Sequence, residues 1–189
     1  MIGIEIKRYF SKRFLPIIVG ALLYGALTVP FNTFETGYAW GIIVKPTIVI
    51  PIIFGIVFGP FAGFVVGLIG NIFSDFVSYG GVFWNWEIAN GLLGAIPGIA
   101  YLVMSRSQWT KARGLALAAV LAIVASVVGV GFATMTDYIF NTGGSPAGSA
   151  FAEFYLVAGS YAVNGAILTP LVLYAYVIAT TRHARRAKH

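Results

Sequence analysis

The chain has 189 residues, of which 59% are hydrophobic and only 10% are charged, and its mean hydropathy is +0.88. A soluble domain carries about 25% charged residues, so this composition excludes an ordinary water-soluble domain and indicates an all-α integral membrane protein. Cysteine is absent, and His183 and His189 are the two histidines. This argues against a histidine metal centre, a catalytic triad and thiol chemistry.

Six stretches are apolar and long enough to cross about 30 Å of hydrocarbon as helices. The first is too long for a signal peptide and has no cleavage site, so we expect it to remain as a helix. Gly59-Pro60 predicts a tight hairpin between the second and third spans, because the residue before a proline disfavours helix. Residues 1–189 are therefore predicted to form a single transmembrane domain, with spans at about 14–32, 41–58, 61–78, 86–105, 114–137 and 151–179.

Basic residues gather in three clusters, which lie before the first span, between the fourth and fifth, and after the sixth. With six spans all three clusters fall on one side, and basic residues in short loops stay cytoplasmic, so both termini are predicted to be cytoplasmic. Lys45 is the one basic residue outside these clusters, and it is predicted to lie on the opposite side. We expect the clusters to contact anionic lipid; nucleic acid is a weaker alternative, because aromatic residues do not interleave with them. The clusters are Lys7, Arg8, Lys12 and Arg13; Arg106, Lys111 and Arg113; and Arg182, Arg185, Arg186 and Lys188.

Five of the six acidic residues fall on the opposite, outer side in this topology. One explanation is a solvated interfacial rim, with Trp84 and Trp86 as part of an aromatic belt. The other is a binding site, because ionisable groups in a membrane persist where they pair, face water or bind a ligand. The five residues are Glu35, Asp75, Glu87, Asp137 and Glu153.

Polar residues within the spans recur at helical spacing, as Asn71 and Asp75 do at i and i+4. An asparagine in hydrocarbon needs a partner, so hydrogen bonds between helices are one explanation. An outward-open pocket is the other, since aromatic walls with a few convergent polar groups suit a small flat ligand. The predicted pocket is lined by Asn71, Asp75, Trp84, Trp86, Glu87, Asn90, Tyr161 and Asn164, with Lys45 at its mouth.

Small residues four positions apart predict close helix packing, and some of these faces could dock another membrane protein. The chain contains no Gly-x4-Gly-Lys-Ser/Thr loop and hence no predicted ATP site. A binding pocket without an energy source suggests a subunit of a larger assembly. The pairs are Ala21 and Gly25, Gly55 and Gly59, Gly63 and Gly67, and Ala118 and Ala122.

Residues 54–76, FGIVFGPFAGFVVGLIGNIFSDF, resemble the substrate-specific (S) components of energy-coupling factor (ECF) transporters. The resemblance covers about residues 41–98, and the six-span layout extends it over the chain. The matching residues are Phe58-Gly59-Pro60, Gly63, Gly67, Gly70-Asn71 and Asp75, and the continuation through Gly80-Gly81, Trp84, Trp86 and Gly91 resembles the riboflavin-type group.

The resemblance implies a six-helix protein of the prokaryotic plasma membrane that captures a vitamin from outside. It implies a transmembrane coupling protein (the T component) and two cytoplasmic ATPases as partners. It also implies that the chain has no enzyme activity and no intrinsic cofactor. Contact with the T component is implied for Ala21 and Gly25, where glycine replaces the alanine of the family. The loop from Thr33 to Trp40 is implied to act as a gate, through Glu35, Tyr38 and Trp40.

Two ligands remain open. The riboflavin-type resemblance favours riboflavin, whereas the acidic residues favour a ligand with hydrogen-bond donors or a positive charge, such as hydroxymethylpyrimidine or a thiamine-like compound. The alternative function is a stand-alone secondary transporter that uses Asp75 or Glu87 as a proton or sodium site and needs no ATPase. A membrane enzyme with Asp75 and Glu87 as an acid–base pair is disfavoured, since the spans contain neither histidine nor cysteine.

Overall fold

The computed structural model describes the chain over residues 2–35, 45–140 and 147–186, and its side chains over residues 14–32, 45–140 and 150–182. No strand occurs in these parts, so the predicted all-α architecture is confirmed. The helices are α1 (Ile2–Glu35), the short 3-10 helix η1 (Pro46–Ile48), α2 (Val49–Phe58), α3 (Pro60–Tyr79), α4 (Trp84–Ala95), α5 (Ile99–Val103), the 3-10 helix η2 (Arg106–Gln108), α6 (Ala112–Phe140) and α7 (Ala147–Arg186).

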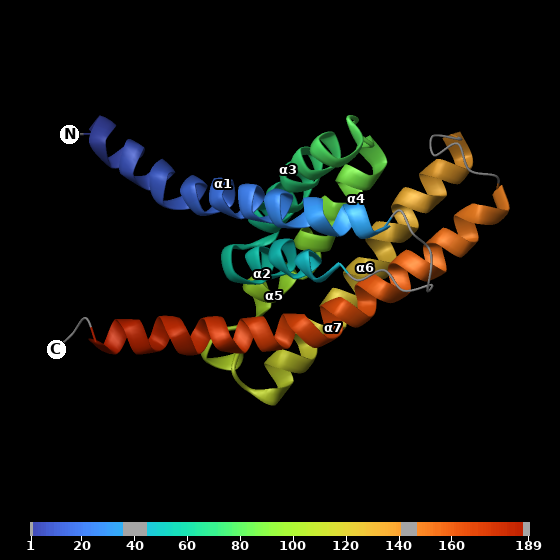
Figure 1. The fold of residues 1–189 in the computed structure, drawn as a ribbon. Coiled ribbons are helices and arrows are strands. Elements are labelled where there is room, and N and C mark those ends of the chain that lie inside the picture. Colours follow the sequence, from blue (N-terminus) through green and yellow to red (C-terminus); the bar gives the residue numbers. More distant parts are fainter. Residues whose placement is uncertain (1, 36–44, 141–146, 187–189) are drawn as a thin grey trace.

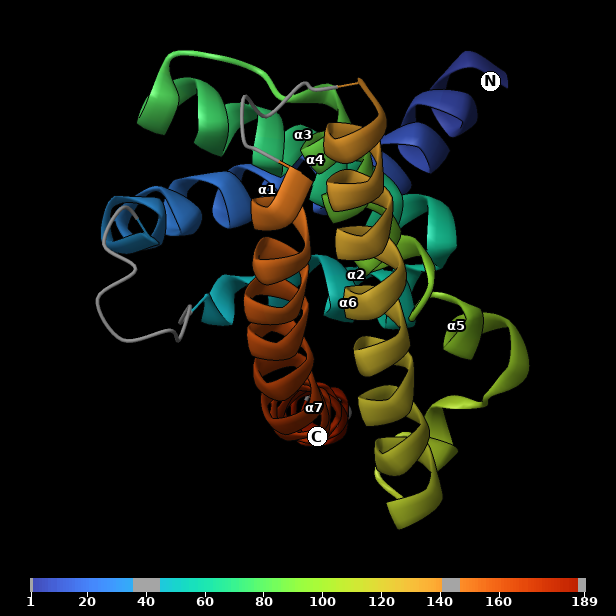
Figure 2. The ribbon, with the colours of Figure 1, turned by 90° about the vertical axis from the view of Figure 1, so that its right-hand side faces the viewer.

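Successive long helices run in alternate directions, so that the first turns of α1 and the last turns of α7 lie at the same end of the molecule (Figure 1). The helices α6 and α7 form an antiparallel pair (Figure 2) that packs against α4 and α2. Pro170 lies inside α7, which bends along its length, as a proline within a helix is expected to cause.

Five helical segments in the described ranges are long and apolar enough to cross a membrane: Phe14–Asn32, Pro60–Tyr79, Trp84–Val103, Ala112–Phe140 and Ala150–Arg182. They correspond to five of the six predicted spans. The second span, predicted at 41–58, is described only from Lys45. Its helical part, Pro46–Phe58, is shorter and would extend roughly 20 Å at 1.5 Å per residue.

The fourth predicted span, 86–105, corresponds to the apolar segment Trp84–Val103, in which the α-helix is interrupted. Helix α4 ends at Ala95 and α5 begins at Ile99. Between them the backbone forms tight turns, in which Ala100 N donates to Pro97 O at 3.0 Å. Pro97 has no N–H and its ring clashes with the preceding helical turn, so it interrupts the α-helix.

The predicted hairpin at Gly59-Pro60 is present. Gly59 separates α2 from α3 and has a φ of 101°, a conformation that favours glycine, and Pro60 begins α3. The glycines also pack as expected, because a Cβ added at Gly63 or at Gly94 would overlap the backbone of the other residue. Helices α3 and α4 therefore touch backbone to backbone.

Candidate functional site

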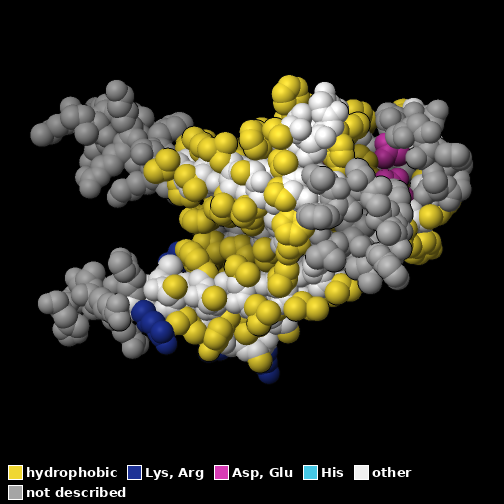
Figure 3. All heavy atoms as spheres, viewed as in Figure 1, with side chains coloured by type: hydrophobic (Ala, Val, Ile, Leu, Met, Phe, Trp, Pro, Cys, Tyr) yellow, Lys and Arg dark blue, Asp and Glu magenta, His cyan; other side chains and the backbone are white. Residues whose placement is uncertain are grey.

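Charged side chains gather at opposite ends of the molecule, as the sequence predicts. Figure 3 shows acidic side chains at one end and basic side chains toward the other. The described acidic residues are Asp75, Glu87, Asp137 and Glu153, and the described residues of the basic clusters are Arg106, Lys111, Arg113 and Arg182. Lys45 lies on the acidic side, close enough to Glu87 to interact with it electrostatically.

Asn71 connects the acidic residues of α3 and α4. Its Nδ2 donates to Asp75 Oδ2 at 2.9 Å and to Glu87 Oε2 at 2.9 Å. The other oxygen of Glu87, Oε1, accepts from the backbone N–H of Phe83 at 3.3 Å. Asn71 and Asp75 thus contact each other on one face of α3, as their spacing predicts. Glu87 joins this contact from α4.

Helix α1 contributes Asn32 to the same group. Asn32 Nδ2 lies 2.7 Å from Ser74 Oγ and 3.4 Å from Asp75 Oδ1. We call Asn32, Asn71, Ser74, Asp75 and Glu87 the polar cluster; their side chains are between 0% and 6% exposed. Because buried polar groups are costly unless they are hydrogen-bonded, this network also holds α1, α3 and α4 together.

Asn90 lies on α4, one turn beyond Glu87, and is likewise buried and bonded. Its Oδ1 accepts from the Tyr24 hydroxyl at 2.6 Å, and its Nδ2 donates to Trp86 O at 2.9 Å. Thr28 donates to Thr47 at 2.9 Å, which connects α1 to η1. Tyr24, Thr28 and Asn32 were not among the predicted site residues, although their spacing of four residues in an apolar span was a usable signal.

Trp86 is oriented by an acidic residue of α6. Its indole Nε1 donates to Asp137 Oδ2 at 2.9 Å. Asn85, which was also not a predicted site residue, donates to Asp137 Oδ1 at 2.7 Å and to Ala133 O at 3.1 Å. Asp137 therefore receives hydrogen bonds from two neighbouring residues of α4 and fixes the start of that helix against α6.

A second group of predicted residues meets on the α6–α7 side. Tyr161 is buried in a hydrophobic cluster against which Trp86 and Phe154 pack. The Lys45 ammonium lies 5.8 Å from the centre of the Tyr161 ring, within the range of a cation–π interaction. We call Lys45, Trp86, Phe154 and Tyr161 the aromatic group. It combines the residue before η1 with residues of α4 and α7.

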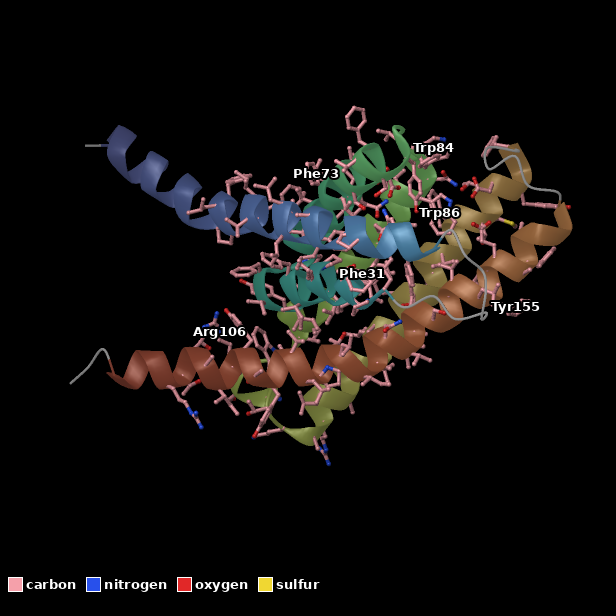
Figure 4. The ribbon with its side chains drawn as sticks, in the orientation of Figure 1. Phe31, Phe73, Trp84, Trp86, Arg106 and Tyr155 are labelled. Carbon is pink, nitrogen blue, oxygen red and sulfur yellow. The ribbon has the colours of Figure 1, made fainter. Side chains whose placement is uncertain are left out.

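Some predicted site residues do not join either group. Trp84 is 47% exposed, and its ring packs edge-on against Phe132. Trp84 and Trp86 are two positions apart on α4 and lie on different sides of the helix (Figure 4). Asn164 is half-buried and donates to Ser160 O of its own helix at 2.8 Å. Of the predicted gate, Glu35 ends α1 with its side chain outside the described part, and Tyr38 and Trp40 also lie outside the described residues.

Ala21 and Gly25, predicted to contact a partner, are buried against α3. A Cβ added at Gly25 would lie 2.7 Å from Gly70 O, and one added at Gly70 would lie 2.8 Å from Ala21 O. The chain's own helix covers this face in the structure. Contact of these residues with a coupling protein stays a prediction.

Four residues of the predicted outward-open pocket lie inside the helix bundle, and their contact with a ligand stays a prediction. Asn71, Asp75, Glu87 and Asn90 are buried, and their hydrogen bonds join α1, α3 and α4. Within the aromatic group, Trp86 and Phe154 are half-buried, whereas Lys45 and Tyr161 are buried.

Comparison with known proteins tests the family resemblance. A family model described as "ECF-type riboflavin transporter, S component" matches residues 13–177. The chain belongs to this S-component family. It is thus the substrate-binding component of a transporter, which is not an enzyme class, and a multi-pass protein of the plasma membrane. S components work in general with a T component and ATPases.

Curated relatives of this S component span most of its length. A UPF0397 protein of Vibrio atlanticus is 27% identical over 169 residues, which cover 87% of this chain and 90% of the relative. A UPF0397 protein of Aliivibrio salmonicida is 27% identical, with 86% and 88% covered, and one of Streptococcus gordonii is 27% identical, with 69% and 70% covered. No solved structure matches the chain.

Proposed function

We propose that this S component captures a small aromatic vitamin or vitamin precursor from outside the cell, at the acidic end of its helix bundle. The observation that carries the proposal is the aromatic group, in which side chains from α4 and α7 and Lys45 meet beside the carboxylate of Asp137. Transport is then driven by a T component and two cytoplasmic ATPases, with both termini of the S component in the cytoplasm.

The aromatic group suits a flat ring. Trp86 is half-buried, and its indole is held in one orientation by Asp137, so its face is preorganised for stacking. Phe154, also half-buried, packs against the same hydrophobic cluster. Convergent aromatic walls with a few oriented polar groups are typical of small-molecule sites.

Two carboxylates near this group, against the one ammonium of Lys45, favour a ligand with hydrogen-bond donors or a positive charge. Asp137 lies beside Trp86 at 2.9 Å, and Glu153 lies one residue before Phe154 on α7. Hydroxymethylpyrimidine and thiamine-like compounds belong to this chemical class. Riboflavin is the second candidate, because it is named in the description of the matching family and also has a flat ring.

Ligand binding is tested by titrating the purified protein with hydroxymethylpyrimidine, thiamine and riboflavin while tryptophan fluorescence is followed. We expect one of the three to bind with submicromolar affinity. Replacing Trp86 by alanine should weaken binding about tenfold, because loss of an aromatic stacking partner costs about 1.4 kcal/mol.

Trp84→Ala is the matched control, since this tryptophan lies two positions away, is largely exposed and is outside the aromatic group. The affinity of the Trp84→Ala variant for the ligand should equal that of the wild type. Equal affinities for a folded Trp86→Ala variant and the wild type would remove the aromatic group from the binding site.

A further inference from the structure

We propose that an open cavity at the basic end of the bundle binds a phosphate ester, the group that the headgroup of an anionic lipid carries. The cavity has a volume of about 720 Å³ and lies between η2, the two residues after it, and the last described turns of α7. The aromatic group lies toward the other end of α7, so this site does not depend on which vitamin the S component captures.

Each wall of the cavity carries an arginine. Arg106 begins η2 and Arg182 lies on α7, and Figure 4 shows Arg106 beside the second half of α7. Both side chains are exposed, and neither forms an ion pair within the described parts of the chain. None of the described residues that line the cavity is acidic. A cleft lined by charges of one sign attracts ions of the opposite sign, so the occupant should be an anion.

Trp109 holds Arg106 in position. This tryptophan is 2% exposed and is packed in the hydrophobic core with Ala118 and Leu173. The Arg106 guanidinium lies 5.9 Å from the centre of the Trp109 ring, within the range of a cation–π interaction. Guanidinium groups bind phosphate through paired N–H donors, and a side chain that is already held in place loses less conformational freedom on binding.

The rest of the lining favours an ester over a bare phosphate ion. Tyr174, Val177 and Ile178 of α7 supply apolar surface to the same cavity. Its volume of about 720 Å³ exceeds that of a phosphate group, which is comparable in size to a few water molecules. Tyrosine and tryptophan are typical of the headgroup level of a bilayer, and basic pockets between membrane helices are typical sites for lipid headgroups. A free phosphorylated solute carries the same group, so the experiment separates the two sources.

The site is tested by thermal unfolding of the full chain in detergent with three added probes. They are dioctanoyl phosphatidylglycerol, glycerol phosphate, and dioctanoylglycerol, which has the same acyl chains but no phosphate. We expect phosphatidylglycerol, at about ten times its dissociation constant, to raise the Tm by about 4 °C and dioctanoylglycerol to leave it unchanged. An equal shift with glycerol phosphate would support the site and assign it to a free phosphate ester. No shift with either phosphate probe, or an equal shift with dioctanoylglycerol, would overturn the proposal.

Replacing both Arg106 and Arg182 by glutamine should abolish the shift, because it removes the guanidinium groups of the cavity. The combination of Lys111→Gln and Arg113→Gln is the matched control. It also removes two positive charges from the basic end, but both side chains are exposed and neither residue lines the cavity. The control should keep the full shift. Equal losses in the two double variants would show a general attraction of anions to basic residues and would contradict a site.

A second measurement applies if the double arginine variant does not fold. Native mass spectrometry then counts the phosphatidylglycerol molecules bound to the wild type and to the variant that lacks Lys111 and Arg113. About one lipid per chain in both proteins supports the site. No bound lipid in the wild type, or fewer in the control variant than in the wild type, overturns it.

Discussion

Replacing Gly94 by alanine is expected to destabilise the S component by about 3 kcal/mol. The new Cβ would overlap the carbonyl group of Gly63, so it meets backbone rather than a side chain that can move aside. Helices α3 and α4 would have to separate. This would also strain the hydrogen bond from Asn71 on α3 to Glu87 on α4. The change is measured as the free energy of unfolding, or as a lowered Tm, in a fixed detergent.

Gly159→Ala is the matched control for this substitution. Gly159 lies in helix α7 and is exposed, and a Cβ added there would meet nothing within 4 Å. Since alanine favours helix over glycine by about 1 kcal/mol, this variant should be as stable as the wild type or slightly more so. If both glycine variants were equally stable, the backbone contact between α3 and α4 would not hold the bundle together.

Replacing Asn71 by leucine is expected to cost about 3–5 kcal/mol, because it removes the shared donor of two buried carboxylates. Leucine has the same branching and the same number of side-chain heavy atoms as asparagine, so it leaves no cavity. The cost comes from two buried carboxylate oxygens, one on Asp75 and one on Glu87, that each lose the hydrogen bond from Asn71. Chemical or thermal unfolding in detergent measures it.

A second substitution separates this electrostatic effect from a packing effect. Adding Glu87→Gln to Asn71→Leu removes one buried charge, so the double variant should be more stable than Asn71→Leu alone. If the double variant instead lost the sum of the free energies of unfolding that the two single variants lose, the carboxylates would not be coupled through Asn71.

The fold was largely predictable because span length and hydropathy are local properties of the sequence. Each of the five apolar helical segments overlaps one predicted span, although α1 begins at Ile2 and α7 ends at Arg186, beyond the predicted ends. The break between α4 and α5 was missed, because Pro97 lies inside an apolar run that is otherwise long enough to cross a membrane. The Gly59 hairpin was found because glycine followed by proline is a local signal.

The site was less predictable because its contacts join distant parts of the chain. Asn71 and Asp75 were paired correctly, since both lie on one helix four residues apart. The contact between Asn32 and Ser74 spans 42 residues and depends on which face of α1 meets α3. Spacing alone does not determine that face. For the same reason, it did not show that Ala21 and Gly25 are covered by α3.

The most direct test of the account is mass spectrometry of small molecules extracted from the detergent-purified protein. An S component that binds its vitamin tightly should retain it through purification, in a ratio of about one ligand per chain. We predict hydroxymethylpyrimidine, a thiamine-like compound or riboflavin, and a clearly reduced amount in Trp86→Ala but not in Trp84→Ala. Retention of a non-aromatic solute, or equal retention in both tryptophan variants, would contradict capture of an aromatic vitamin at the aromatic group.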